Sequence, residues 1–105
     1  MSRIFDHLVG QKIQNAVVVY DYIQIFFGNG AVLNVFNTFV LAGFEYDAVS
    51  QLIGCEVSAV NESETEVKFA FLDNKSLSIN LRDSAYKGPE AMEFFREDGE
   101  CIVWN

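Results

Sequence analysis

The feature that most constrains the fold is a repeat: the chain matches itself when it is shifted by 44 residues without a gap. The match carries residues 8–37 onto 52–81. Alternating apolar positions coincide: Ile23, Ile25, Phe27, Leu33 and Val35 fall on Val67, Phe69, Phe71, Leu77 and Ile79. Self-similarity at a fixed period is typical of repeated supersecondary units. We interpret the two segments as a duplication; the alternative is two hairpins that follow the same rules independently.

Each copy has the pattern of a three-stranded antiparallel meander. Apolar residues alternate with polar ones, as in Val67-Lys68-Phe69-Ala70-Phe71, and this period of two indicates half-buried strands. The turns Gly28-Asn29-Gly30 and Asp73-Asn74-Lys75 suit the positive φ of tight hairpins. The predicted strands cover residues 12–19, 22–27 and 32–40 in the first copy and 56–61, 65–71 and 76–82 in the second.

The segment 88–105 follows a different pattern. Gly88-Pro89 breaks the chain, and Asp98-Gly99 is a turn signal between residues 91–95 and 101–104. We favour a C-terminal hairpin, although Pro89 also suits the first position of a helix over residues 90–96. With 105 residues the chain has the size of one domain with one core. The sequence therefore predicts a single all-β domain, residues 1–105, that forms an antiparallel sandwich or a partly open barrel.

The charge is distributed unevenly between the two halves. Residues 1–44 carry two acidic and two basic side chains, whereas residues 45–105 carry thirteen and five, which accounts for the whole net charge of −8. An acidic surface repels phosphate backbones, so we expect no nucleic-acid partner. The sequence holds no run of about 18 apolar residues and no signal-peptide pattern, so we expect a cytoplasmic protein with no membrane partner. We expect Cys55 and Cys101 to be reduced.

The two copies also differ on the side of each meander that faces away from the predicted core. In the first copy this side is apolar, whereas the equivalent positions of the second copy are mainly charged or small. An uncovered apolar patch invites association. We expect a homodimer to cover it; the alternatives are the C-terminal segment of the same chain or a different partner. The residues predicted for this interface are Val18, Tyr20, Tyr22, Phe26 and Phe36.

Acidic residues mark a second candidate surface. Glu62, Glu64 and Glu66 alternate, so we expect them on one face, with Asp73 and Asp83 close to the same sheet. Such a face either keeps the protein soluble or steers a basic partner toward it. The functional hypothesis is a docking surface for a basic protein.

Residues that carry chemistry are sparse. The single histidine, His7, has no nucleophile near it in sequence, and it forms no zinc-ligand pattern with the two cysteines. We therefore expect no catalytic residues, no metal site and no cofactor, and hence a protein that is not an enzyme. The leading function is non-enzymatic protein binding; the alternatives are a small-molecule-binding β-barrel and a structural homodimer module.

Several short motifs carry a resemblance over residues 50–105. They are Leu52-Ile53-Gly54, the alternation of 67–71, Gly88-Pro89-Glu90-Ala91-Met92, Asp98-Gly99 and Val103-Trp104. In these motifs the chain resembles a group of small acidic all-β proteins of bacteria, largely of unknown function. Some of that group are similar to immunity proteins, which neutralise toxins delivered between bacteria. The resemblance implies an interaction role and no catalytic residues.

Overall fold

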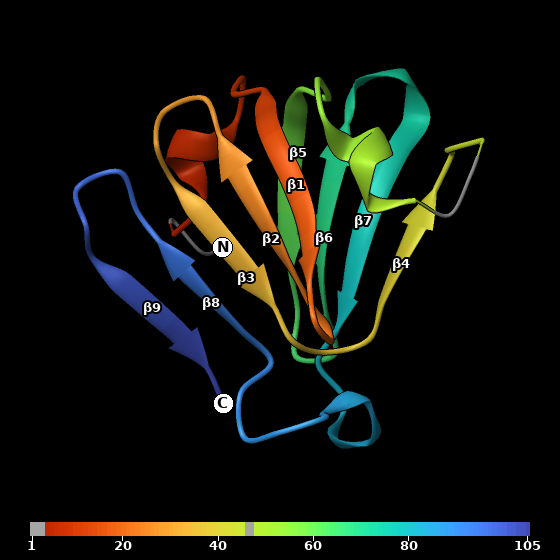
Figure 1. The fold of residues 1–105 in the computed structure, drawn as a ribbon, viewed down its shortest axis with the longest axis vertical. Helices are drawn as coiled ribbons and strands as arrows, with labels where there is room; N and C mark the ends of the chain where they lie inside the picture. The colour runs from red at the N-terminus through yellow and green to blue at the C-terminus, as the bar shows by residue number, and fades with distance from the viewer. Residues whose placement is uncertain (1–3, 46–47) are drawn as a thin grey trace.

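The computed structural model describes residues 4–45 and 48–105, and within these residues the fold is all-β. Nine strands form two antiparallel sheets, and the helices are single 3-10 turns (Figure 1). The strands are β1 (Ile13–Val19), β2 (Tyr22–Phe27), β3 (Val32–Val35), β4 (Phe39–Ala42), β5 (Val57–Glu62), β6 (Glu66–Phe71), β7 (Lys75–Asn80), β8 (Met92–Phe95) and β9 (Cys101–Trp104). The 3-10 turns are η1 (Asp6–Leu8), η2 (Val49–Leu52), η3 (Leu72–Asn74) and η4 (Asp83–Ala85).

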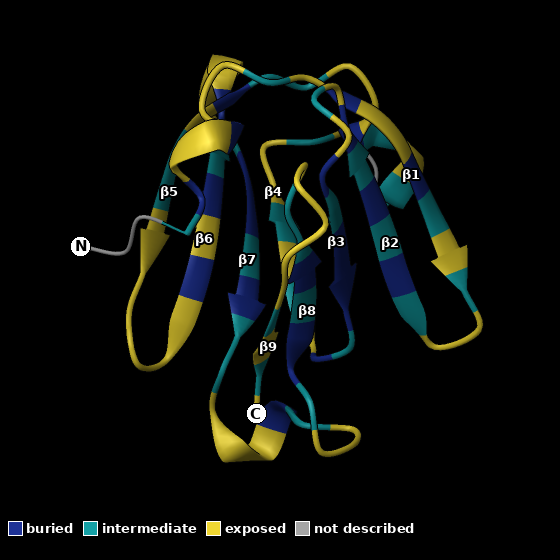
Figure 2. Ribbon diagram, turned by 90° about the vertical axis from the view of Figure 1, so that its left-hand side faces the viewer, coloured by how far each residue is buried: buried dark blue, intermediate teal, exposed yellow. Residues whose placement is uncertain are grey.

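The two sheets pack as a sandwich and do not close into a barrel. The five-stranded sheet has the order β1-β2-β3-β8-β9, and the four-stranded sheet has the order β4-β7-β6-β5. Figure 2 shows buried and more exposed residues alternating along β2 and β6, as expected for strands with one face toward a core. The all-β prediction is therefore confirmed, in its sandwich form.

One predicted strand is wrong. Residues 32–40 do not form a single strand, because the chain leaves the five-stranded sheet after β3 and enters the four-stranded sheet as β4. Asn37 marks this crossing. Its backbone N–H and that of Phe36 both donate to the carbonyl oxygen of Ala91, and its Nδ2 donates to the oxygen of Asn80 at 2.8 Å. These bonds replace the ladder that a continuous strand would have kept.

The C-terminal hairpin is confirmed, and residues 92–95 form a strand rather than part of a helix. β8 pairs with β3 on one side and with β9 on the other. The hairpin thus extends the five-stranded sheet at its edge (Figure 1). Because both strands lie in the plane of that sheet, they do not cover its outer face.

Hydrogen bonds between the halves occur in matched pairs at an offset of 44 residues. The N–H of Gly10 donates to the oxygen of Val57, and the N–H of Gly54 donates to the oxygen of Ile13, each at 2.8 Å. Both glycines have a φ of 89°, in the left-handed region that favours glycine. The two halves therefore meet about an approximate twofold relationship. Their origin by duplication stays a prediction.

The core lies between the sheets and includes a residue from outside every strand. Phe5 is 4% exposed, and its ring contacts those of Phe69, Phe94 and Trp104 at centroid distances of 5.2, 5.0 and 5.5 Å. Phe69 belongs to one sheet, and Phe94 and Trp104 belong to the other. Phe5 therefore fills the space between the sheets where β9 approaches β5.

Candidate functional site

The outer face of the five-stranded sheet carries a set of large apolar side chains that remain partly accessible. Cross-strand partners share a face of a sheet, so the partner register identifies this set. We call it the outer apolar face; its members are Val17, Val19, Tyr22, Phe26, Val32, Phe36, Phe95 and Val103. Val103 is 40% exposed and the other members are partly buried, whereas Ile23, Ile25 and Phe27, which alternate with them along β2, are fully buried. The structure thus leaves apolar side chains partly accessible along the outer face of one sheet.

The outer face of the four-stranded sheet has a different composition at equivalent positions. Where the first half has Tyr22, Phe26, Val32 and Phe36, the second half has Glu66, Ala70, Ser76 and Asn80 at the offset of 44. Val40 is the one large apolar side chain on the described part of that face. The two related three-stranded units therefore differ in their outer surfaces: the first is mainly apolar and the second is mainly polar or small.

Two residues predicted for the apolar interface lie elsewhere. Val19 pairs with Tyr22 across a two-residue turn, so even-numbered residues of β1 share a face with odd-numbered residues of β2. Val18 is therefore opposite Ile23 on the inner face, although it is 63% exposed at the end of the strand. Tyr20 is in the turn itself, with a φ of 55° and 97% exposure. Tyr22, Phe26 and Phe36 lie on the outer face, as the alternation predicts.

A polar row crosses the middle of the outer apolar face. Asn34 lies between Gln24 and Glu93 in the register and is 7% exposed. Its Nδ2 donates to Glu93 Oε1 at 3.0 Å, while its Oδ1 is buried and has no hydrogen-bond partner among the described residues. An unpaired buried acceptor costs about 1–3 kcal/mol. The structure thus holds a polar group at the centre of this face at a cost in stability.

A hollow of about 330 Å³ lies at one end of the outer apolar face. Its aromatic wall is formed by Tyr22 and Phe36, whose ring centroids are 5.1 Å apart at an interplanar angle of 57°. The other lining residues are Asp21 and the segment 87–90. Lys87 Nζ donates to the backbone oxygen of Asp21 at 3.5 Å, which connects that segment to the β1–β2 turn. The hollow has room for one or two side chains of a covering protein.

The five acidic residues predicted as one docking surface do not form one. Glu62 is opposite Val67, so it points to the inner face, whereas Glu66 is opposite Asn80 on the outer face. The reason is the same odd-to-even pairing that displaces Val18. Glu64 is in the turn between them, Asp73 is in the η3 turn at the other end of β6, and Asp83 is in η4 beyond β7. The prediction of one shared face for Glu62, Glu64 and Glu66 is therefore wrong.

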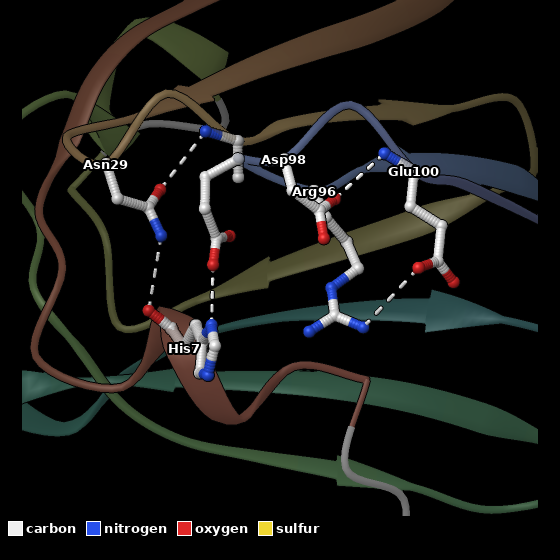
Figure 3. Close-up of polar contacts among 7 residues, drawn as sticks. His7, Asn29, Arg96, Asp98 and Glu100 are labelled. Atoms are coloured by element: carbon white, nitrogen blue, oxygen red, sulfur yellow. Dashed lines mark hydrogen bonds and ion pairs between the residues drawn. The ribbon is translucent and has the colours of Figure 1, made fainter.

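His7 takes part in a set of polar contacts near the β8–β9 turn (Figure 3). Its Nδ1 donates to Glu97 Oε1 at 2.5 Å, and its backbone oxygen accepts a hydrogen bond from Asn29 at 3.3 Å. The hydrogen bond from His7 lowers the pKa of Glu97. In the same turn, Asp98 accepts a bond from the N–H of Glu100 at 2.9 Å. These contacts connect the β8–β9 turn to η1 and to the β2–β3 turn.

The other titratable groups in the part of the chain that the structure describes form no metal-binding cluster. No three His, Cys, Asp or Glu side chains of the described residues lie close enough together to hold a metal ion. Cys55 and Cys101 are both free thiols. Loss of solvent contact raises the pKa of both thiols. The nearby positive charge of Lys75 partly offsets this increase at Cys55. The negative charges of Glu93 and Glu90 raise the pKa of Cys101 further. Both groups are therefore mainly protonated at neutral pH.

No helix in residues 4–45 or 48–105 has the length and apolar character needed to cross a bilayer. Comparisons with protein-family models, with curated proteins and with solved structures give no match to this chain.

Proposed function

We propose that the chain is a non-enzymatic protein-binding module and that the outer apolar face is its binding surface. The observation that supports this most is the contrast between the two sheets. Phe26 and its equivalent Ala70 have the same place in the same architecture, yet only the first half keeps large apolar groups there. The second half forms the equivalent strands with Glu66, Ala70, Ser76 and Asn80 at these positions, so this strand arrangement can form without large apolar groups there. Large exposed apolar patches mark interaction sites.

The occupant that we propose is a second copy of the chain. Glu93 is the one charged residue among the outward side chains of the described five-stranded sheet. Strands β1, β2 and β3 come from residues 1–44, whose net charge is zero. Contact through this face leaves the outer faces of the two four-stranded sheets pointing away from each other. Repulsion between these surfaces is screened over a Debye length of about 8 Å.

A matched pair of substitutions tests this proposal. Phe26→Glu places a charge within the outer apolar face, and Ala70→Glu places the same charge at the equivalent position of the other sheet. Sedimentation at increasing concentration is expected to show a monomer for Phe26→Glu and a dimer for Ala70→Glu and for the unmodified chain. A folded Phe26→Glu variant with unchanged mass would contradict the proposed interface.

A second candidate function is capture of a basic protein, in the manner of an immunity protein. The net charge of −8 favours it, and both Glu64 and Glu66 are exposed. Charge reversal of these two residues is expected to weaken capture at low salt, whereas reversal of Asp73, at the other end of the sheet, serves as the control. Equal capture by both variants would contradict this candidate.

With either occupant, we propose a cytoplasmic location, in keeping with two free thiols.

A further inference from the structure

The two sheets have four edge strands, and three of them have features that discourage addition of another strand. β1 and β5 each contain a register irregularity near the start of the strand. Such irregularities protect edges from pairing. β9 also pairs in unbroken register, but the margin beside it is bridged, because Trp104 Nε1 donates across it to Glu62 Oε2 of β5 at 2.9 Å. β4, the fourth edge, pairs with β7 in unbroken register and has the sequence Phe-Val-Leu-Ala, without charge or proline.

The free edge of β4 presents unused backbone groups. Asn80 donates its N–H to the backbone oxygen of Thr38 at 3.0 Å, which identifies the Thr38–Asn80 pair as a hydrogen-bonded pair of the β4–β7 ladder. Antiparallel pairs alternate between bonded and non-bonded positions, so Val40 and Ala42 bond to β7. The N–H and C=O groups of Phe39 and Leu41 then point away from the sheet. Within the described residues, no backbone or side-chain group is bonded to them.

The approximate twofold relationship indicates what is missing at this edge. β8 lies beside β3, and β4 lies beside β7, which is the equivalent of β3 at the offset of 44. β8 carries β9 on its outer edge, whereas no strand of residues 4–45 and 48–105 lies on the outer edge of β4. Figure 1 shows β9 and β4 at opposite margins of the molecule. The four-stranded sheet therefore has an acceptor position that the five-stranded sheet fills with its own C-terminus.

The side chains at this margin define the chemistry of the incoming strand. In β9, Ile102 and Trp104 lie opposite the buried Phe94 and Met92. The indole N–H of Trp104 donates a hydrogen bond to Glu62. At the β4 margin, Phe39 and Leu41 lie opposite the buried Ile79 and Leu77. Val18 is the equivalent of Glu62 there and offers no acceptor. An apolar side chain without a polar group, such as Phe, suits that position better than Trp.

We propose that β4 accepts an extended segment of another protein, which adds antiparallel to it as a fifth strand. Main-chain hydrogen bonds to Phe39 and Leu41 hold the segment, and two apolar side chains at alternate positions pack toward the core. Strand addition at an exposed sheet edge is a recurrent mode of peptide recognition. If the outer apolar face forms the proposed dimer, the occupant is not a second copy, because a second self-complementary contact on each chain would build an assembly larger than that dimer. Only this choice of another protein over a second copy rests on the proposed function.

A synthetic peptide tests the proposal without altering the protein. The probe copies residues 100–105 with Cys101→Ser and Trp104→Phe, and it is added to the isotopically labelled full chain. We expect the amide signals of Phe39 and Leu41 to shift and their hydrogen exchange to slow several-fold, while the amides of Val40 and Ala42 change little. In the β9 geometry, positions 102 and 104 bond to the neighbouring strand. Peptides N-methylated there are expected not to bind, and peptides N-methylated at 101 and 103 are expected to bind normally.

Three outcomes would overturn the inference: no shift at millimolar peptide, shifts confined to β8 through displacement of β9, or equal binding by the two methylated peptides. The Phe26→Glu variant separates this result from the proposed dimer. Strand addition at β4 is expected to persist in that variant even though the dimer is lost. Loss of peptide binding in a folded Phe26→Glu monomer would place the peptide on the outer apolar face and would contradict the inference.

Discussion

Trp104 and Glu62 connect the edges of the two sheets. The indole Nε1 of Trp104, at the end of β9, donates to Glu62 Oε2, at the end of β5, over 2.9 Å. The same indole stacks on Phe5 at a centroid distance of 5.5 Å and an interplanar angle of 12°. The Trp104 side chain thus connects β9 both to Phe5, which precedes η1, and to Glu62 at the end of β5. This margin is closed, whereas the equivalent margin beside β4 is open.

Removal of the indole N–H tests this connection. Trp104→Phe keeps an aromatic ring against Phe5 but cannot donate to Glu62, so we expect the free energy of unfolding to fall by about 1 kcal/mol. Denaturant unfolding measures the change. Glu64→Gln, in the neighbouring turn, is the control and is expected to leave stability within about 0.5 kcal/mol of the original. A Trp104→Phe variant as stable as the original chain would show that the bond contributes nothing.

Alkylation of Cys101 reports whether the outer apolar face is covered. Cys101 is the cross-strand partner of Phe95 and is exposed in the single chain. In a Cys55→Ser background, we expect its alkylation rate to fall several-fold as protein concentration rises, because a second copy covers the face. The Phe26→Glu variant should react at a rate independent of concentration. Because desolvation and two nearby glutamates raise the thiol pKa, the rate should also increase as the pH rises through the alkaline range.

The His7–Glu97 contact predicts a pH dependence at the acidic side. The folded-state pKa of Glu97 is lowered, first by the hydrogen bond from His7. A carboxyl group with a lowered pKa contributes stability above its unfolded-state pKa and loses it as the pH falls through the folded-state value. His7→Ala is expected to move the pKa of Glu97, followed by NMR, back toward its ordinary value and to reduce this acid dependence. An unchanged Glu97 titration in the variant would contradict the contact.

Gly43 is expected to be the glycine least tolerant of a side chain. It has a φ of 85°, and a Cβ there would lie 2.6 Å from the backbone oxygen of Asn74. Gly30 has a similar φ of 94° but open space around the same position. We expect Gly30→Ala to cost about 1–2 kcal/mol for the backbone conformation alone, and Gly43→Ala to cost clearly more. Thermal unfolding compares the two; equal losses would mean that the β6–β7 turn moves aside easily.

The sequence predicts local pairing in this fold better than it predicts long-range pairing. The alternation of 67–71 and the Asp98-Gly99 signal locate β6 and the C-terminal hairpin, because both depend on neighbours along the chain. The placement of β8 in the five-stranded sheet and of β4 in the four-stranded sheet depends on partners about 40–60 residues away. The mainly apolar segment 32–40 reads as one strand, so it conceals the crossing between the sheets. Asn37, a polar residue within that run, was the available signal of the crossing.

The candidate surface, like the fold, is only partly predictable from the sequence. The contrast between Phe26 and Ala70 is visible in the sequence, since it needs only the repeat and the alternation. The faces taken by Val18 and Glu62 depend on the hairpin register, in which odd residues pair with even ones. A count along the chain that ignores this pairing assigns both residues to the wrong face. Phe5 has no strand pattern around it, so only the structure identifies it as part of the core.

The solution mass of the unmodified chain as a function of concentration shows whether the outer apolar face binds a second copy. If the outer apolar face binds a second copy, light scattering after size separation should give the mass of two 11.8 kDa chains at the higher concentrations and should approach that of one chain on dilution. A mass of one chain at every concentration, with the protein folded and soluble, would contradict the proposed dimer.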